Sequence, residues 1–265
     1  MHKPLTPLLA VAALAAHSVY ADFARQFRAK DIRNDGTWPS FSHKAVMSAV
    51  HSDNSNGWIH AVADKTIRPF GAVSFETTPQ GTPSPFVFDR NNTTQFVSHA
   101  FVVVYADSEP SAMSTLISAP SVPLMLEPEF ANTLFDTPPF SREFITEFYG
   151  ESSEVGVDGA NKPLFTSSDR PKLVHCHWET PQPASCLFVG NSPANRLWQR
   201  EWKGSGIAEI ILAGELDAGS VNAIKRYVSA VFGIRNISYS DPDVPSILRS
   251  LGMDNLPFGT LTIIR

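Results

Sequence analysis

The chain has 265 residues, of which 43% are hydrophobic and 18% are charged. This composition excludes an intrinsically disordered chain, a coiled coil and a disulfide-dense scaffold, and it predicts a globular protein with a sizeable core. The formal net charge of −5 argues against a nucleic-acid partner, because nucleic-acid binders carry a basic surface.

Residues 1–21 are typical of a secretory signal peptide. Lys3 gives a basic start, and residues 8–16 are an uninterrupted apolar run. Val19 and Ala21 then have the smaller side chains expected at a cleavage site. The run is too short to cross a bilayer, and no later segment is long and apolar enough. We therefore predict a mature chain of residues 22–265, secreted or in the lumen of the secretory pathway, without membrane contact. A buried N-terminal helix is the alternative.

Sequons and cysteines fit the same compartment. Asn91, Asn92 and Asn236 each begin an Asn-x-Ser/Thr sequon, which we interpret as glycosylated surface loops. Cys176 and Cys186 are the only cysteines, and in an oxidising compartment we expect them to form one disulfide. A two-cysteine metal site is the alternative.

The first half of the chain alternates short apolar runs with turn residues. Weak helical spacing predicts short helices at 23–27 and 43–50, and a further short helix is predicted at 111–118. Strands are predicted at 58–63, 71–75, 86–88 and 96–106. The last of these, FVSHAFVVVYA, is nearly continuous in hydrophobicity, as expected for a strand that is buried on both faces.

Prolines deny any long element to the middle of the chain. Residues 141–149 are predicted as a helical turn or a strand, and residues 195–202 as a short helix. The segments 172–179 and 186–189 are predicted as two strands, interpreted as a hairpin whose proline-containing loop is closed by the disulfide.

The last third predicts a strand at 207–213, an amphipathic helix at 220–232, and strands at 234–239 and 260–264. Ser220 is the expected cap at the start of the helix and Gly233 the expected cap at its end. The whole pattern predicts an α+β fold, as one β-rich globular domain.

Two segments share one layout. Residues 99–107 and 209–217 are each a predicted strand that begins with a metal-ligating residue type, ends with Asp and precedes a predicted helix. This layout resembles the strand–helix opening of glyoxalase-like (vicinal-oxygen-chelate) modules. A chance coincidence of strand and helix in an α+β domain is the alternative.

The resemblance implies two related halves, 96–190 and 206–265, whose sheets would form a cup around a divalent metal ion. In such modules the first strand of each half points a ligand into the cup. Carried over to this chain, the resemblance nominates His99 and Glu209 as metal ligands.

The densest group of reactive side chains is the run from Val174 to Glu179. Because side chains alternate along a strand, one face is predicted to carry His175, His177 and Glu179. The other face is predicted to carry Val174, Cys176 and Trp178. Two imidazoles and a carboxylate suit a three-ligand metal site, and a neutral histidine also transfers protons without metal. An exposed hairpin face with two surface histidines is the alternative.

Two hypotheses for function follow. The first is a small-molecule enzyme of the lyase, isomerase or cyclase type, in which His175, His177 and Glu179 transfer protons, with or without a divalent metal ion on His99 and Glu209. No motif for an organic cofactor or a serine nucleophile elbow is present in the sequence. The second is a non-enzymatic secreted glycoprotein that binds a ligand or a host surface. Either would be a monomer or a homodimer.

Overall fold

A computed structural model describes part of the chain. It covers residues 23–33, 37–41, 45–49, 60–62, 70–74, 86–88, 95–106, 116–119, 132–133, 145–149, 156–157, 171–184, 187–189, 205–234 and 244–253. The signal segment, the three sequons and Cys186 lie outside these residues, and so do the elements predicted at 195–202 and 260–264 and all of the strand predicted at 234–239 except Ile234. These expectations stay predictions.

The larger sheet has eight strands in the order β11-β10-β12-β7-β14-β5-β4, with β1 also paired to β14, and every pairing in it is antiparallel. Its strands are β1 (Ala24–Arg28), β4 (His60–Val62), β5 (Ala72–Ser74), β7 (Phe96–Ala106), β10 (Ile145–Tyr149), β11 (Gly156–Val157), β12 (Pro171–Pro183) and β14 (Ser205–Ala213). The predicted strand 96–106 is confirmed as β7 and lies at the centre, between β12 and β14.

A second, smaller sheet has six strands in the order β2-β3-β6-β13-β8-β9. Its strands are β2 (Thr37–Pro39), β3 (Val46–Ala49), β6 (Phe86–Phe88), β8 (Ile117–Ala119), β9 (Asn132–Thr133) and β13 (Phe188–Val189). The helical elements among the described residues are α2 (Ala218–Phe232), α3 (Val244–Ser250) and the short 3-10 helix η1 (Ala29–Asp31). The described residues therefore form an α+β fold of largely antiparallel sheets.

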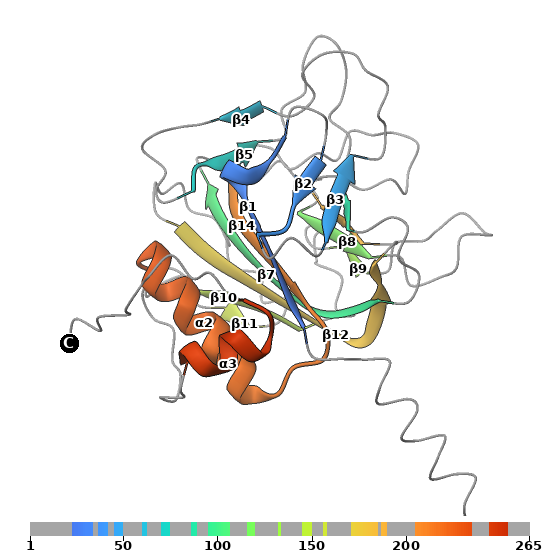
Figure 1. Cartoon of the computed structure of the whole chain (residues 1–265), viewed down its shortest axis with the longest axis vertical. Helices are drawn as coiled ribbons and strands as arrows, with labels where there is room; N and C mark the ends of the chain where they lie inside the picture. The colour runs from blue at the N-terminus through green and yellow to red at the C-terminus, as the bar shows by residue number, and fades with distance from the viewer. Residues whose placement is uncertain are drawn as a thin grey trace, which may run out of the picture.

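The elements stack in three layers, with the large sheet in the middle (Figure 1). One of its faces packs on the smaller sheet through a core that includes Trp38, Val102 and Trp178. The opposite face packs on α2 and α3 through a core that includes Phe101 and Tyr227. We call these the sandwich face and the helix face.

Helix α2 fixes how the chain leaves the large sheet. Its start is capped by Asp217, whose carboxylate accepts a hydrogen bond from the Ser220 amide at 2.6 Å, so Ser220 is not the cap that we predicted. Gly233 ends the helix in the left-handed region at φ 68°, as predicted. The predicted apolar stripe is confirmed, since Ile224, Tyr227 and Val228 are buried against the sheet.

Three predicted helices are wrong where the structure describes them. Strand β1 covers residues 24–27 of the first segment, and strand β3 covers residues 46–49 of the second. In the third segment only residues 116–118 are described, and they enter strand β8. Each is too short for spacing to separate a helix from a strand, and neighbouring strands supply the backbone hydrogen bonds. Helix α3 was not predicted. Its first turn contains Pro245, and a proline is tolerated there because the first backbone N–H groups of a helix have no partner within the helix.

The predicted hairpin is also wrong. Strand β12 continues to Pro183 in the large sheet, whereas β13 pairs with β6 and β8 in the smaller sheet. Pro181 and Pro183 therefore lie in a strand, after an irregularity in the register between His177 and Gln182, and not in a loop. Cys176 is buried in the core between the sheets, and its pairing with Cys186 stays a prediction.

One bulge interrupts β14. Ile207 pairs with Val104 and Glu209 pairs with Val103, so Ala208 is an extra residue on this strand. Ile207 packs on the sandwich face, whereas Ala208 packs on the helix face. Glu209 lies opposite Val103, which also packs on the helix face, so its carboxylate is directed toward α2.

Candidate functional site

Strand register brings three histidines together on the helix face. His177 of β12 lies opposite His99 of β7, and His175 lies opposite Phe101. Directly opposed residues of antiparallel strands share a face, and Phe101 belongs to the helix-face core. We call His99, His175 and His177 the histidine cluster.

The rings of the cluster form a stack. His99 and His177 lie 4.3 Å apart between ring centroids with planes 3° apart, and Phe101 and His175 lie 4.2 Å apart, also at 3°. His99 lies 5.4 Å from His175. The stack fixes the planes of all four rings on adjacent strands.

A hydrogen bond joins the two buried histidines. His99 Nδ1 lies 3.1 Å from His175 Nε2, and these residues are 3% and 5% exposed. Only one proton fits between the two nitrogens, so one ring donates and the other accepts. His177 is only partly buried, so it is the imidazole of the cluster that solvent reaches.

Glu215 joins the cluster from the end of β14. Ala213 lies opposite His99, and Glu215 follows two residues later. His99, His177 and Glu215 can each offer one ligand atom, and these atoms all lie within 4.8 Å of one another. We call this set the ligand triad. Its three members differ in burial, because His99 is buried, His177 is partly buried and Glu215 is exposed.

The backbone on both sides of Glu215 is held. The Gly214 amide donates to the carbonyl oxygen of Phe23 at 3.2 Å, which ties the end of β14 to the start of β1. The Asp217 cap then fixes the first turn of α2. Glu215 therefore occupies a defined position between a sheet and a helix.

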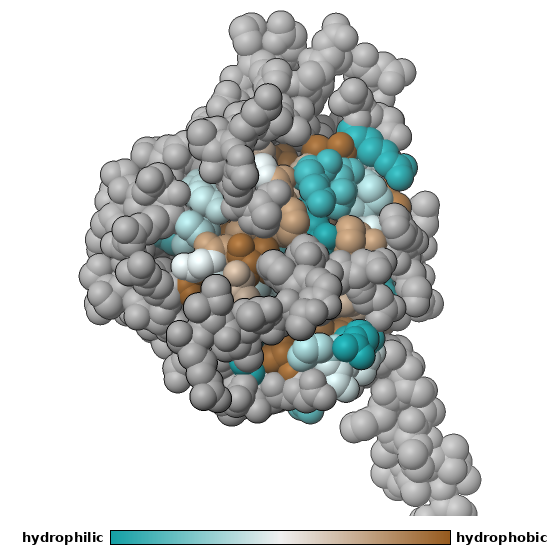
Figure 2. Space-filling model, turned by 60° about the vertical axis from the view of Figure 1, so that its left-hand side comes forward, coloured by the Kyte–Doolittle hydropathy of each residue, from teal (hydrophilic) through white to brown (hydrophobic). Residues whose placement is uncertain are grey.

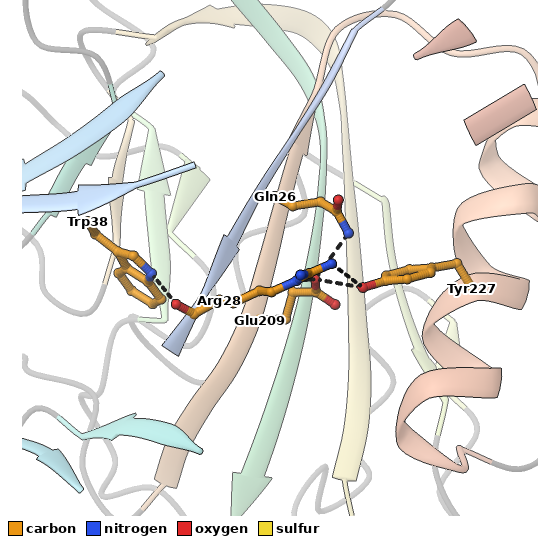
Figure 3. A network of polar contacts seen from close by, with 5 residues as sticks. All are labelled: Gln26, Arg28, Trp38, Glu209 and Tyr227. Atoms are coloured by element: carbon orange, nitrogen blue, oxygen red, sulfur yellow. Dashed lines mark hydrogen bonds and ion pairs between the residues drawn. The ribbon is translucent and has the colours of Figure 1, made fainter. Parts of the chain in front are cut away.

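The structure does not bring Glu209 to the histidines. Glu209 lies opposite Val103, four residues along β14 from the partner of His99, or roughly 13 Å. There it belongs to a buried acid cluster with Gln26, Arg28 and Tyr227 (Figure 3). His99 and Glu209 thus do not form one metal site in this structure.

The buried acid cluster converges on one oxygen. Glu209 Oε1 accepts hydrogen bonds from the Tyr227 hydroxyl at 3.0 Å and from Gln26 Nε2 at 3.2 Å, and it lies 3.5 Å from Arg28 Nε. Arg28 Nη2 also donates to the Tyr227 hydroxyl at 3.4 Å. Glu209 Oε2 has no hydrogen-bond partner among the described residues. In Figure 3, Tyr227 reaches from α2 to the strands that carry the other three residues.

Burial sets the electrostatics of this cluster. Burial raises the pKa of Glu209 to about 7, against the opposing effects of the Arg28 charge and the hydrogen bonds. Burial, together with the Glu209 charge, also raises the pKa of Tyr227 well above its ordinary value. The guanidinium of Arg28 lies 3.6 Å from the centroid of the Phe41 ring, in a cation–π contact.

The alternation predicted for the histidine strand is confirmed where it is described. Val174, Cys176 and Trp178 pack on the sandwich face, while His175 and His177 stack on the other face. The side chain of Glu179 lies outside the described residues. Sequence reasoning missed Glu215, although its place two residues after the predicted strand 207–213 was a usable signal.

Sequence reasoning also missed Arg28 and Tyr227. Tyr227 was recognised only as part of an apolar stripe, and Arg28 directly follows the segment 23–27 that was predicted as helix. No pattern in the sequence links them to Glu209, because they lie on three separate elements.

The described surface offers no large apolar patch. Val46, at 39% exposed, is the one large exposed hydrophobic residue among the described residues. On the face drawn in Figure 2, described hydrophobic residues lie mainly at the centre, and hydrophilic ones gather beside them. No helix in the described part of the chain is long and apolar enough to cross a membrane.

Comparisons of the chain with known protein families, with curated proteins and with solved structures give no match. The resemblance to glyoxalase-like modules therefore stays a prediction, and the candidate site has to be interpreted from its own geometry.

Proposed function

We propose that the chain is a small-molecule enzyme of the lyase, isomerase or cyclase type, whose proton transfers take place at the histidine cluster and Glu215. The observation that carries this proposal is the meeting of His99, His177 and Glu215 at one end of the large sheet, with ligand atoms within 4.8 Å. Secretion, glycosylation and a monomeric or homodimeric state are part of the proposal as the sequence predicts them.

The reaction that this site supports is removal of a proton beside a carbonyl group. His177 is the partly exposed imidazole, so it accepts the proton while the C–H electron pair moves into an enolate. In an isomerase the proton returns to a different carbon, and in a lyase the electron pair expels a leaving group. The hydrogen bond between His99 and His175 holds the two rings behind His177 in place.

The proposal also keeps the idea of two related halves. The direct pairing of β7 with β14 supports it, since these are the two strands that carry the shared layout. Strand β8 covers the described end of the helix expected at 111–118, which counts against it. The non-enzymatic alternative gains no support from the described residues, whose only large exposed hydrophobic residue is Val46.

Proton exchange tests this proposal without a known substrate. The purified chain is incubated in D2O with a panel of small aldehydes, ketones and 2-keto acids, and ¹H NMR follows the loss of signals beside the carbonyl group. We expect faster exchange of at least one compound than in buffer, and a loss of about 100-fold in His177→Ala.

Asp217→Asn is the matched control for the exchange assay, because Asn also caps helices and the residue lies outside the ligand triad. It should keep the wild-type rate. The absence of exchange above buffer across the panel, or full exchange by His177→Ala, overturns the proposal.

A further inference from the structure

We infer that His99, His177 and Glu215 bind one divalent transition-metal ion of the zinc class, and that His175 is the positioning residue behind this site. The inference deepens the proposed function. The role that it gives the ion in catalysis rests on that function. It differs from the pair that the sequence nominated, because Glu215 takes the place that was assigned to Glu209.

The donor set selects the class of ion. Two imidazole nitrogens and one carboxylate oxygen suit Zn²⁺ and related first-row ions, which accept three protein ligands and keep a position open for water or substrate. Ca²⁺ and Mg²⁺ prefer sites made of oxygen atoms alone. The triad therefore discriminates against the hard cations.

A small rearrangement brings the donors to ligand distance. A tetrahedral ion with bonds near 2.1 Å holds its donors roughly 3.4 Å apart, and the triad atoms lie within 4.8 Å of one another. The rings of His99 and His177 are parallel, and the lone pair of each ring nitrogen lies in the plane of its ring. The two lone pairs therefore cannot point at one ion until one ring turns. His99 is 3% exposed and bonded to His175, so we expect the partly exposed His177 to turn.

His175 prepares His99 for this task. Its Nε2 lies 3.1 Å from His99 Nδ1, which leaves Nε2 of His99 as the coordinating nitrogen. The stack of His175 on Phe101, at 4.2 Å, fixes the plane of the supporting ring. Histidine ligands in metal sites commonly have their second nitrogen held in this way, and the support strengthens metal binding.

The ion changes the chemistry of the proposed reaction. With His177 and Glu215 as ligands, His177 would no longer accept the proton itself, and the ion would polarise the carbonyl oxygen of the substrate and stabilise the enolate. Water bound to the ion, as hydroxide, then accepts the proton and becomes water. No oxidant or reductant is needed.

A Co²⁺ titration of the full-length, tag-free protein tests the site, because Co²⁺ replaces Zn²⁺ and its absorbance reports coordination. We expect one Co²⁺ per chain, displaced by one equivalent of Zn²⁺ and unaffected by millimolar Mg²⁺. His177→Ala and Glu215→Gln should each weaken binding by about 100-fold or more. Asp217→Asn is the matched control and should bind as the wild type does.

The role of His175 is tested by two variants that fill the same place. His175→Phe keeps a ring to stack on Phe101 but loses the hydrogen bond, so we expect affinity for Co²⁺ to fall by about 10- to 100-fold. His175→Gln keeps a hydrogen-bonding group and should recover part of the loss. Equal affinity in both variants contradicts the positioning role.

The outcomes separate this inference from the proposed function. No stoichiometric Co²⁺ binding by wild type, or unchanged binding in both His177→Ala and Glu215→Gln, overturns the metal site. Should both variants fail to fold by circular dichroism, NMR of the wild type decides, because the metal must shift the ring signals of His99 and His177. Metal binding without proton exchange supports the metal site and overturns the proposed function. Proton exchange without stoichiometric Co²⁺ binding supports the proposed function and overturns the metal site. Exchange that persists in EDTA overturns the role of the ion in the reaction.

Discussion

Two polar clusters lie on the same face of the same sheet, and they differ in their access to solvent. Gln26, Arg28, Glu209 and Tyr227 are all at most 1% exposed, and Arg28 faces the Glu209 carboxyl group inside the cluster. In the ligand triad, by contrast, solvent exposure increases from the buried His99 to the exposed Glu215. The difference teaches that ionisable side chains alone do not mark a site. The closed cluster serves the fold, whereas the open one can meet a substrate or an ion.

The largest expected effect comes from breaking the closed cluster. Arg28→Met leaves Glu209 buried without its cation, which we expect to lower the free energy of unfolding by about 3–5 kcal/mol. The double variant Arg28→Met/Glu209→Leu removes both charges and should recover most of this loss. Urea unfolding measures both, and a double variant no more stable than Arg28→Met contradicts the account.

The pH dependence of stability should follow Glu209. Its pKa is about 7 in the folded protein and 4.5 as a model value, so the folded state keeps a proton that the unfolded state releases between these pH values. The free energy of unfolding should therefore fall, by up to about 3 kcal/mol, as pH rises from 4.5 to 7, and this contribution should stay level above pH 7. Subtracting the profile of Glu209→Gln isolates it, and a difference that is flat or rises with pH would refute the assignment.

A smaller effect is expected from Tyr227→Phe, which removes one hydroxyl from the closed cluster. Glu209 Oε1 loses a donor and Arg28 Nη2 loses an acceptor, which should cost about 1–2 kcal/mol. Thermal unfolding checks this, and a Tyr227→Phe variant as stable as the wild type would argue against the network.

The helix start beside the open cluster should contribute about 1 kcal/mol. Asp217→Ala removes the cap, while Asp217→Asn keeps one. The hydrogen bonds to Ser220 lower the pKa of Asp217, so the stabilisation is present above its unfolded pKa and is lost as pH falls through the lower folded value. Urea unfolding at neutral and acidic pH checks this, since the gap between wild type and Asp217→Ala should close in acid.

The smallest stability effect is expected in the open cluster itself. His177→Ala removes a partly buried ring from a cross-strand stack, which should cost about 0.5 kcal/mol. The same substitution is the one expected to lower proton exchange and metal affinity by about 100-fold. A loss of several kcal/mol in urea unfolding would instead place His177 with the structural residues.

The sequence predicted the centre of the molecule better than its edges. Strand β7, strand β14 and helix α2 carry long or strongly periodic apolar patterns, so their types were predictable. The alternation of His175 and His177 with Cys176 was predictable for the same reason. Strands β1, β3 and β8 were not, because a few residues of pattern do not separate a strand from a helix.

The site was only partly predictable because its members meet through register. His99 and His177 were nominated separately, and only the pairing of β7 with β12 shows that they stack. Glu209 was nominated with His99 from a shared layout, but the antiparallel pairing of β7 and β14 puts the start of one strand beside the end of the other. The strand register therefore places Glu215, which follows the end of β14, beside His99 in place of Glu209.

The bulge at Ala208 has a consequence for how the chain can vary in length. Ala208 and Glu209 together oppose Val103, so deleting Ala208 would restore a regular ladder. Ile207 would still face the sandwich core and Glu209 would still face α2. We expect this position, in the most buried part of the sheet, to accept a one-residue insertion or deletion that other central positions would not. Length differences between homologues of this chain are therefore expected there as well as in surface loops.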